Sequence, residues 1–139
     1  MEWNNIIMEA FLSTKDIFTI FISTFYFLVL DFLFLYWNRD VFEKQVIQVQ
    51  RVSLQMKPFG AILCYLFLIF GLYFFILREN KTPLEAFLFG IVVYGVYETT
   101  TYTLLKNWKI TTVITDTLWG GVLFYLTTFL TYKSKSNLI

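Results

Sequence analysis

Three acidic residues stand inside long apolar stretches of this sequence: Asp31, Glu98 and Asp116. An ionised carboxylate near the centre of a bilayer costs roughly 2.5–3.5 kcal/mol. The same stretches contain no Lys, Arg or His that could neutralise the acids. Three kinds of compensation are therefore open. The carboxyls can be protonated, they can bind a cation through their oxygens, or they can accept hydrogen bonds in a buried packing network.

The composition is that of a membrane protein. Of the 139 residues, 58% are hydrophobic and 22% are aromatic, and the mean hydropathy is +0.63. A soluble domain of this size leaves much of its surface exposed and could not bury so many apolar side chains. The net charge of +1 provides no basic surface for nucleic acid, so no nucleic-acid partner is expected.

The residue types that support most enzyme chemistry are scarce. The chain has no histidine, and its single Cys64 excludes an intramolecular disulfide and a cysteine-built metal site. Because Cys64 lies in an apolar run, we predict a buried, inert thiol. No nucleophile–base pair, metal motif or cofactor fingerprint is present. We therefore assign no catalytic residue, expect no cofactor, and favour a non-enzymatic role.

Four apolar segments are long enough to span a bilayer. They predict one integral, multi-pass membrane domain over residues 1–139, with an all-α fold in which four helices form a bundle. The tight links at 78–83 and 106–109 make the last three helices antiparallel neighbours. The predicted spans are residues 17–37, 59–77, 84–105 and 110–132.

Two further segments have the pattern of short amphipathic helices. In the link 38–57, Phe42, Val46 and Val49 recur at helical spacing among charged residues. The N-terminal segment 3–11 shows the same pattern, with apolar residues at Trp3, Ile6, Ile7, Ala10 and Phe11. Both predict interfacial helices lying on the membrane surface, with a partner-binding helix as the alternative.

Counting along the predicted helices places the three acids at one level. Asp31 lies six residues before the end of its span, Glu98 seven before the end of its span, and Asp116 six after the start of its span. At 1.5 Å per residue, all three lie about 9–10 Å inside the same face of the bilayer. Tyr65 falls at the same depth on the second span.

Polar and small residues extend this acidic layer. Tyr94 and Tyr102 flank Glu98, and Trp119 flanks Asp116, at three- or four-residue spacing. Such faces turn inward in a membrane bundle, and glycines allow the helices to approach closely. Close approach is predicted at Gly95, Gly120 and Gly121. The candidate ion- or ligand-binding residues are Asp31, Glu98, Asp116, Tyr65, Tyr94, Tyr102 and Trp119.

The string YGVYETTTYTLLKNWKITTVITDTLWG resembles the signature of a family of small four-helix membrane proteins, the predicted-membrane-protein family called domain of unknown function 2177. Leu30-Asp31 resembles the family's motif in its first helix, and the likeness covers roughly residues 17 to 131. Glu98, Thr101 and Phe34 stand where the family usually has Asp, Asn and Trp. The resemblance implies a four-helix integral membrane protein, without an established activity. The matching residues are Tyr94, Gly95, Tyr97, Thr100, Trp108, Thr112, Asp116, Trp119 and Gly120.

Three classes of function remain open. The leading hypothesis is transport or binding of a proton, cation or polar ligand at the acidic layer. The second is a structural or assembly protein whose acids only pack the bundle, and the third is an intramembrane enzyme that uses a carboxyl as acid or base on lipid. The lipid bilayer is the expected partner. A second copy in a homodimer, which an alternating-access carrier would need, and a lipid-like ligand are the other partners considered.

Overall fold

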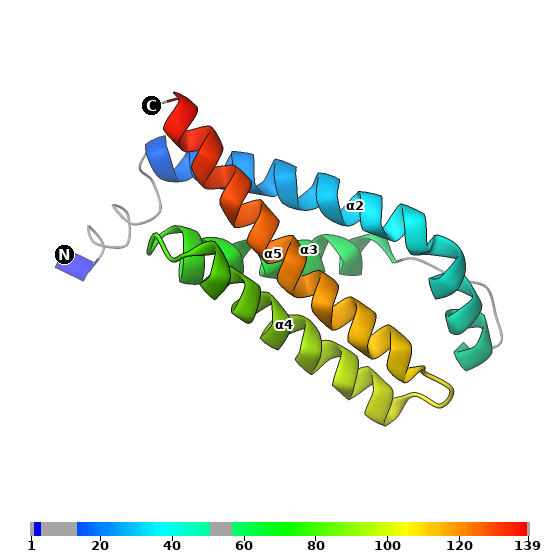
Figure 1. Ribbon diagram of the computed structural model, residues 1–139. Helices are drawn as coiled ribbons and strands as arrows, with labels where there is room; N and C mark the ends of the chain where they lie inside the picture. Colours follow the sequence, from blue (N-terminus) through cyan, green and yellow to red (C-terminus); the bar gives the residue numbers. More distant parts are fainter. Residues whose placement is uncertain (1, 4–13, 51–56, 139) are drawn as a thin grey trace.

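The computed structural model describes residues 2–3, 14–50 and 57–138, and the long elements in these ranges are all helical (Figure 1). This confirms the prediction of an all-α fold with four principal helices. By length and composition, three described segments could cross a membrane: Lys15–Ile47, Pro58–Leu77 and Ile110–Asn137. The elements are α2 (Thr14–Gln50), α3 (Pro58–Leu72), the π-helical turn η1 (Tyr73–Leu77), α4 (Pro83–Leu104) and α5 (Ile110–Leu138).

Helix α2 is longer than predicted. It continues without interruption to Gln50, so the expected separate interfacial helix in the link 38–57 was wrong for the described part of that link. The reason is local, because residues 38–50 contain neither glycine nor proline and the first proline after the span is Pro58. The predicted N-terminal amphipathic helix falls, apart from Trp3, on residues outside the described ranges.

The last turns of α2 bend and are fixed to the start of α5 (Figure 1). Gln45 is only 2% exposed. Its Oε1 accepts hydrogen bonds from the Lys109 backbone N–H at 3.0 Å and from the Thr112 hydroxyl at 2.8 Å. This pair of bonds satisfies a backbone donor at the start of α5 that has no partner within its own helix. It also fixes the last turns of α2 against the start of α5.

Helices α4 and α5 form an antiparallel hairpin, and the start of α4 is clearly encoded. The Thr82 hydroxyl accepts from the Glu85 N–H at 3.2 Å, and the Glu85 carboxylate accepts from the Thr82 N–H at 2.8 Å. This reciprocal capping box, followed by Pro83 in the first turn, is a strong helix-start signal. Asn107, in the short link that follows α4, takes a left-handed conformation with φ 68°.

The two helices of the hairpin pack backbone against backbone. A Cβ atom added to Gly90 would overlap the Gly120 carbonyl group and lie 3.0 Å from Phe124 Cγ. A Cβ at Gly120 would overlap the Tyr94 ring, and one at Gly121 would lie 2.7 Å from Phe87. The predicted close approach therefore occurs at Gly120 and Gly121. It does not extend to Gly95, whose nearest neighbour would lie at an ordinary contact distance of 3.5 Å.

The apolar core lies toward the end of the bundle that carries the C-terminus. Phe27, Leu72, Leu123 and Phe124 are each 0% exposed and belong to one cluster. The Phe27 ring contacts the rings of Phe124 and Tyr65 edge-on, at centroid distances of 5.6 and 6.2 Å. This cluster, called the apolar layer below, takes side chains from α2, α3, η1, α4 and α5.

Candidate functional site

A cavity of about 710 Å³ lies on the other side of this apolar layer and receives side chains from all four helices. It is lined by the three acids singled out from the sequence, Asp31 from α2, Glu98 from α4 and Asp116 from α5. All three are buried, with exposed fractions of 6%, 1% and 8%. Residues 31, 98 and 116 are far apart in the chain, and the fold brings them to one site.

Asp31 is held by donors from two other helices. Its Oδ2 accepts a hydrogen bond from the Tyr65 hydroxyl of α3 at 2.5 Å. Its Oδ1 accepts one from the Trp119 indole N–H of α5 at 3.0 Å. The Trp119 ring is itself fixed by stacking on Phe34 of α2, with centroids 4.5 Å apart and planes at 5°. Asp31 thus has one donor for each oxygen and joins three helices.

Glu98 accepts a hydrogen bond from a tryptophan outside the predicted candidate set. The indole N–H of Trp108, in the link between α4 and α5, donates to Glu98 Oε2 at 3.0 Å. Tryptophans near helix ends commonly lie at the level of the lipid headgroups, so the position of Trp108 in the sequence does not by itself indicate a contact with a buried acid. Here the ring also lines the cavity and supplies a donor to a buried acid.

Asp116 is the acid whose hydrogen bonding is incomplete. Its carboxyl interacts electrostatically with that of Glu98 on α4. One of its oxygens, Asp116 Oδ1, is buried and finds no hydrogen-bond partner among the described residues. A buried acceptor without a donor costs about 1–3 kcal/mol, and more when it is charged. Asp116 therefore offers the cavity an acceptor that protein groups leave free.

Of the other four predicted site residues, three line the cavity and one does not. Tyr65, Tyr94 and Trp119 line the cavity with the acids. Trp119 donates to Asp31, although it lies nearly one turn from Asp116 on α5. Tyr102 is 49% exposed and is not among the cavity-lining residues, so the structure does not bring it to the acids. The helical spacing of Tyr102 from Glu98 was therefore a weaker guide than the burial of each side chain.

The cavity walls are aromatic, and no Lys or Arg lies among the described residues that form them. Half of the lining side chains are aromatic rings. The faces of such rings attract cations. The combination of three acids with these rings suits a positively charged group far better than an anion. The aromatic lining residues are Phe34, Phe42, Tyr65, Phe67, Phe89, Tyr94, Tyr97, Trp108, Trp119 and Phe124.

Cys64 lies at the edge of this cavity. The prediction of a buried thiol was wrong, because the side chain is exposed and also lines the cavity. Hydropathy places Cys64 within an apolar helix, but it does not determine which way the residue faces. The outer part of α3 has few neighbours, and Phe67, one turn from Cys64, is 74% exposed.

The acids do not form a compact metal centre. Within the described part of the chain, no three Cys, Asp or Glu side chains come close enough together to hold a metal ion. A hard cation such as Ca²⁺ needs six to eight oxygen ligands at 2.3–2.6 Å. The spread of the carboxyls over the wall instead suits a larger ligand that contacts one acid or one pair.

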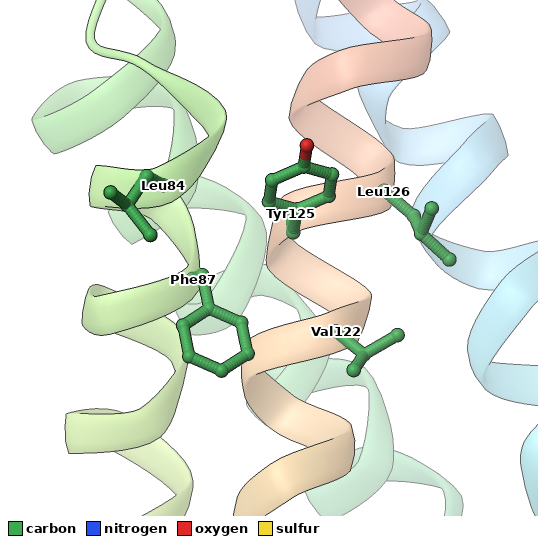
Figure 2. Close-up of a pocket in the computed structure, with 5 residues that line it drawn as sticks. All are labelled: Leu84, Phe87, Val122, Tyr125 and Leu126. Carbon is green, nitrogen blue, oxygen red and sulfur yellow. The ribbon is translucent and has the colours of Figure 1, made fainter.

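A second, smaller hollow of about 340 Å³ lies between α4 and α5 (Figure 2). It is lined by Leu84 and Phe87 of α4 and by Val122, Tyr125 and Leu126 of α5. The Tyr125 hydroxyl is the one polar side-chain atom in this set, and no charged side chain belongs to it. This hollow is a shallow apolar surface feature and offers no chemistry comparable to that of the acid-lined cavity.

The hydrogen bond from Tyr65 to Asp31 leads to a first prediction. The Tyr65→Phe variant leaves Asp31 Oδ2 buried without a donor, so we expect the free energy of unfolding to fall by about 1–3 kcal/mol. Thermal unfolding in a mild detergent measures this change. The matched control is Tyr102→Phe, which removes a phenol hydroxyl from a half-exposed position and should leave the stability unchanged. Equal melting temperatures for the two variants would contradict the prediction.

Comparison with known proteins gives one result. The model of a family described as a predicted membrane protein matches residues 17–133, which is most of the chain and includes all three acids. No curated protein and no solved structure matches the chain.

Proposed function

Because the chain belongs to the predicted membrane protein family DUF2177, we propose that it is a multi-pass membrane protein that binds a positively charged polar ligand in the acid-lined cavity. In this proposal α2, α3 and α5 cross the bilayer. Helix α4, which corresponds to the third predicted span (residues 84–105), lies against α5 as the fourth member of the bundle. The bilayer is the surrounding solvent, and Asp31, Glu98 and Asp116 are carboxyls within it.

The observation that carries this proposal is the free oxygen of Asp116. Asp116 Oδ1 is buried, lacks a donor among the described residues, and belongs to a residue that lines a cavity without lysine or arginine in its described walls. A ligand cation would supply the missing donor or charge. It would also pair with the Glu98 carboxyl, which interacts with that of Asp116.

The geometry supports an organic cation over the other ligands considered for an acidic layer. A proton alone does not require a cavity of 710 Å³. A metal ion requires a tighter group of oxygen ligands than the described residues provide. An organic ammonium ion is large enough to occupy the cavity and needs no tight group of oxygen ligands. Its charge pairs with carboxylates, and its carbon substituents pack against aromatic faces.

The apolar layer favours binding over free passage. Phe27, Leu72 and Phe124 are fully buried between the cavity and the end of the bundle that carries the C-terminus. A ligand at the acids meets these packed side chains, so movement through the bundle requires the layer to open. We therefore propose binding as the basic activity, with transport as an activity that would need a further conformation.

The test uses tetraethylammonium and protein purified in an uncharged detergent. We expect saturable binding by isothermal titration calorimetry to the wild-type protein. Asp116→Asn and Glu98→Gln should each weaken it roughly 10- to 100-fold, about 1.4–2.8 kcal/mol, because each removes a negative charge that pairs with this quaternary cation.

Glu79→Gln is the matched control, because it removes an acid whose side chain is 52% exposed and pairs with Arg78 outside the cavity. It should bind tetraethylammonium with wild-type affinity. Absence of binding to the wild-type protein, or unchanged affinity in the Asp116→Asn, Glu98→Gln double variant, would refute the proposed function.

A second role is supported for Asp31 alone. Both of its oxygens have donors, and these donors come from α3 and α5. Such a fully satisfied carboxylate stabilises the arrangement of three helices without any ligand. We propose that Asp31 chiefly packs the bundle, whereas Glu98 and Asp116 face the ligand.

A further inference from the structure

The cavity has a side opening between α3 and α4. Three of its lining residues are strongly exposed at this seam: Cys64 and Phe67 on α3, and Tyr97 on α4, with Phe67 74% and Tyr97 64% exposed. A residue that both lines a cavity and is exposed marks its mouth. This opening therefore faces sideways from the bundle, toward the surrounding lipid in the proposed arrangement. Leu35 of α2 also lines the cavity and is 42% exposed, so it marks another edge.

The seam is closed at its other end. A Cβ atom on Gly71 of α3 would lie 3.4 Å from the Phe89 ring of α4, and the Phe75 and Phe89 rings are 5.7 Å apart. The helices thus touch at Gly71 and Phe89. They leave space around Cys64, which comes before Gly71 on α3, and Tyr97, which comes after Phe89 on α4. A molecule in the cavity can extend out through this space without crossing the apolar layer.

The cavity is acidic at one end and apolar at the seam between α3 and α4. An amphiphile, with a charged head and an apolar chain, has the same division. The acids belong to α2, α4 and α5, whereas the seam is lined by Ala61, Cys64, Phe67 and Val93 with the phenol of Tyr97. A cationic head would lie at Glu98 and Asp116, and an apolar chain would run past Cys64 and Phe67. A phosphate-bearing headgroup would meet three acids and no described basic partner in the wall.

We propose that the ligand is a single-chain ammonium amphiphile that enters from the bilayer between α3 and α4, with its head at the Glu98–Asp116 pair and its chain in the seam. This inference rests on the proposed function, because it uses the same carboxyls. It adds the apolar chain, the route and the residues that line it.

The first arm of the test varies the chain. Binding of ethyl-, butyl- and octyltrimethylammonium to the wild-type protein is compared in an uncharged detergent, after correction for partition into micelles. Each methylene that leaves water contributes about fourfold in affinity. We expect octyltrimethylammonium to bind at least tenfold more tightly than ethyltrimethylammonium, and octyl sulfate, with the same chain and an anionic head, not to bind.

The second arm uses the natural thiol. Cys64 is the one cysteine of the chain, so N-ethylmaleimide labels a single site at the mouth. Saturating octyltrimethylammonium should slow this alkylation at least fivefold, whereas tetraethylammonium, which has no long chain, should slow it less than twofold. Neither compound should protect Cys64 in Asp116→Asn at the same concentration.

A third arm fills the seam. Val93 lines the cavity on α4, and Val93→Trp places a large ring where the chain would lie. We expect this variant to lose the tenfold advantage of octyltrimethylammonium and to keep its affinity for tetraethylammonium. The chain-length comparison and the protection of Cys64 in the wild-type protein do not use Val93→Trp, so they decide the proposal even if this variant folds poorly.

The outcomes separate the two proposals. Asp116-dependent binding of tetraethylammonium with no gain from chain length and no protection of Cys64 would overturn the amphiphile and leave the cation site standing. Absence of binding by every ammonium compound would overturn both. Binding of octyl sulfate as tightly as octyltrimethylammonium would show that the chain alone is recognised, and this would overturn the role of the acids.

Discussion

Replacing Gly90 by alanine is expected to lower the free energy of unfolding by about 3 kcal/mol, at the upper end of the usual cost of overpacking. The new Cβ atom would overlap the backbone carbonyl of Gly120 on α5, and a backbone group cannot move aside as a side-chain tip can. The two helices would have to separate. Because Glu98 lies on α4 and Asp116 on α5, their contact would also be disturbed.

Two glycine variants control for this prediction. Gly60→Ala on α3 places its Cβ where no atom lies within 4 Å, and Gly95→Ala on α4 makes only an ordinary contact at 3.5 Å. Both should be tolerated, and the lower backbone entropy of the unfolded chain can raise stability by about 0.4–1 kcal/mol. Thermal unfolding in detergent gives the comparison. If Gly90→Ala has the same melting temperature as these controls, the contact between Gly90 and Gly120 does not limit side-chain size, and the prediction is refuted.

The second large effect is expected at Asp31. Asp31→Ala leaves the Tyr65 hydroxyl and the Trp119 N–H without their acceptor, at about 1–3 kcal/mol for each of these partly buried donors. Asp31→Asn retains one carbonyl oxygen and can serve one of the two donors. Stability should therefore decrease in the order wild type, Asp31→Asn, Asp31→Ala, as measured by thermal or denaturant unfolding.

Asp40→Ala is the matched control on the same helix. Its side chain is 80% exposed and its pair with Arg39 spans 4.0 Å, which is a contact of little energetic value. This variant should have the same free energy of unfolding as the wild-type protein. If Asp31→Ala is as stable as Asp40→Ala, Asp31 does not pack the bundle, and its burial would need another explanation.

The sequence predicted the positions of the helices well, because each apolar run is as long as a membrane-spanning helix and ends at proline or charged residues. Residues 59–77 and 110–132 are apolar runs bounded by proline or charged links, and α3 with η1 and α5 cover them. The same counting placed Asp31, Glu98 and Asp116 at one level, and the structure brings them to one cavity. Position along a helix axis can be counted from its ends, so these predictions needed no knowledge of packing.

Predictions that depend on rotation about a helix axis were less successful. Cys64 and Tyr102 were expected to face inward, and both are exposed. Gln45 was part of a charged stretch and gave no signal of burial, yet it joins α2 to α5. In an apolar helix nearly every face is hydrophobic, so periodicity does not identify the inward one. Contacts such as that of Trp108 with Glu98 depend on tertiary packing, which the spacing of residues does not encode.

The donors of Asp31 also set an order of events during synthesis. Tyr65 lies 34 residues after Asp31 in the chain, and Trp119 lies 88 residues after it. A nascent chain therefore carries this acid without either donor until Tyr65 of α3 is made, and the second donor arrives only with α5. Chains that stop before Trp119 retain an incompletely bonded carboxyl. The site around Asp31 is therefore completed only when the last helix of the bundle, α5, is in place.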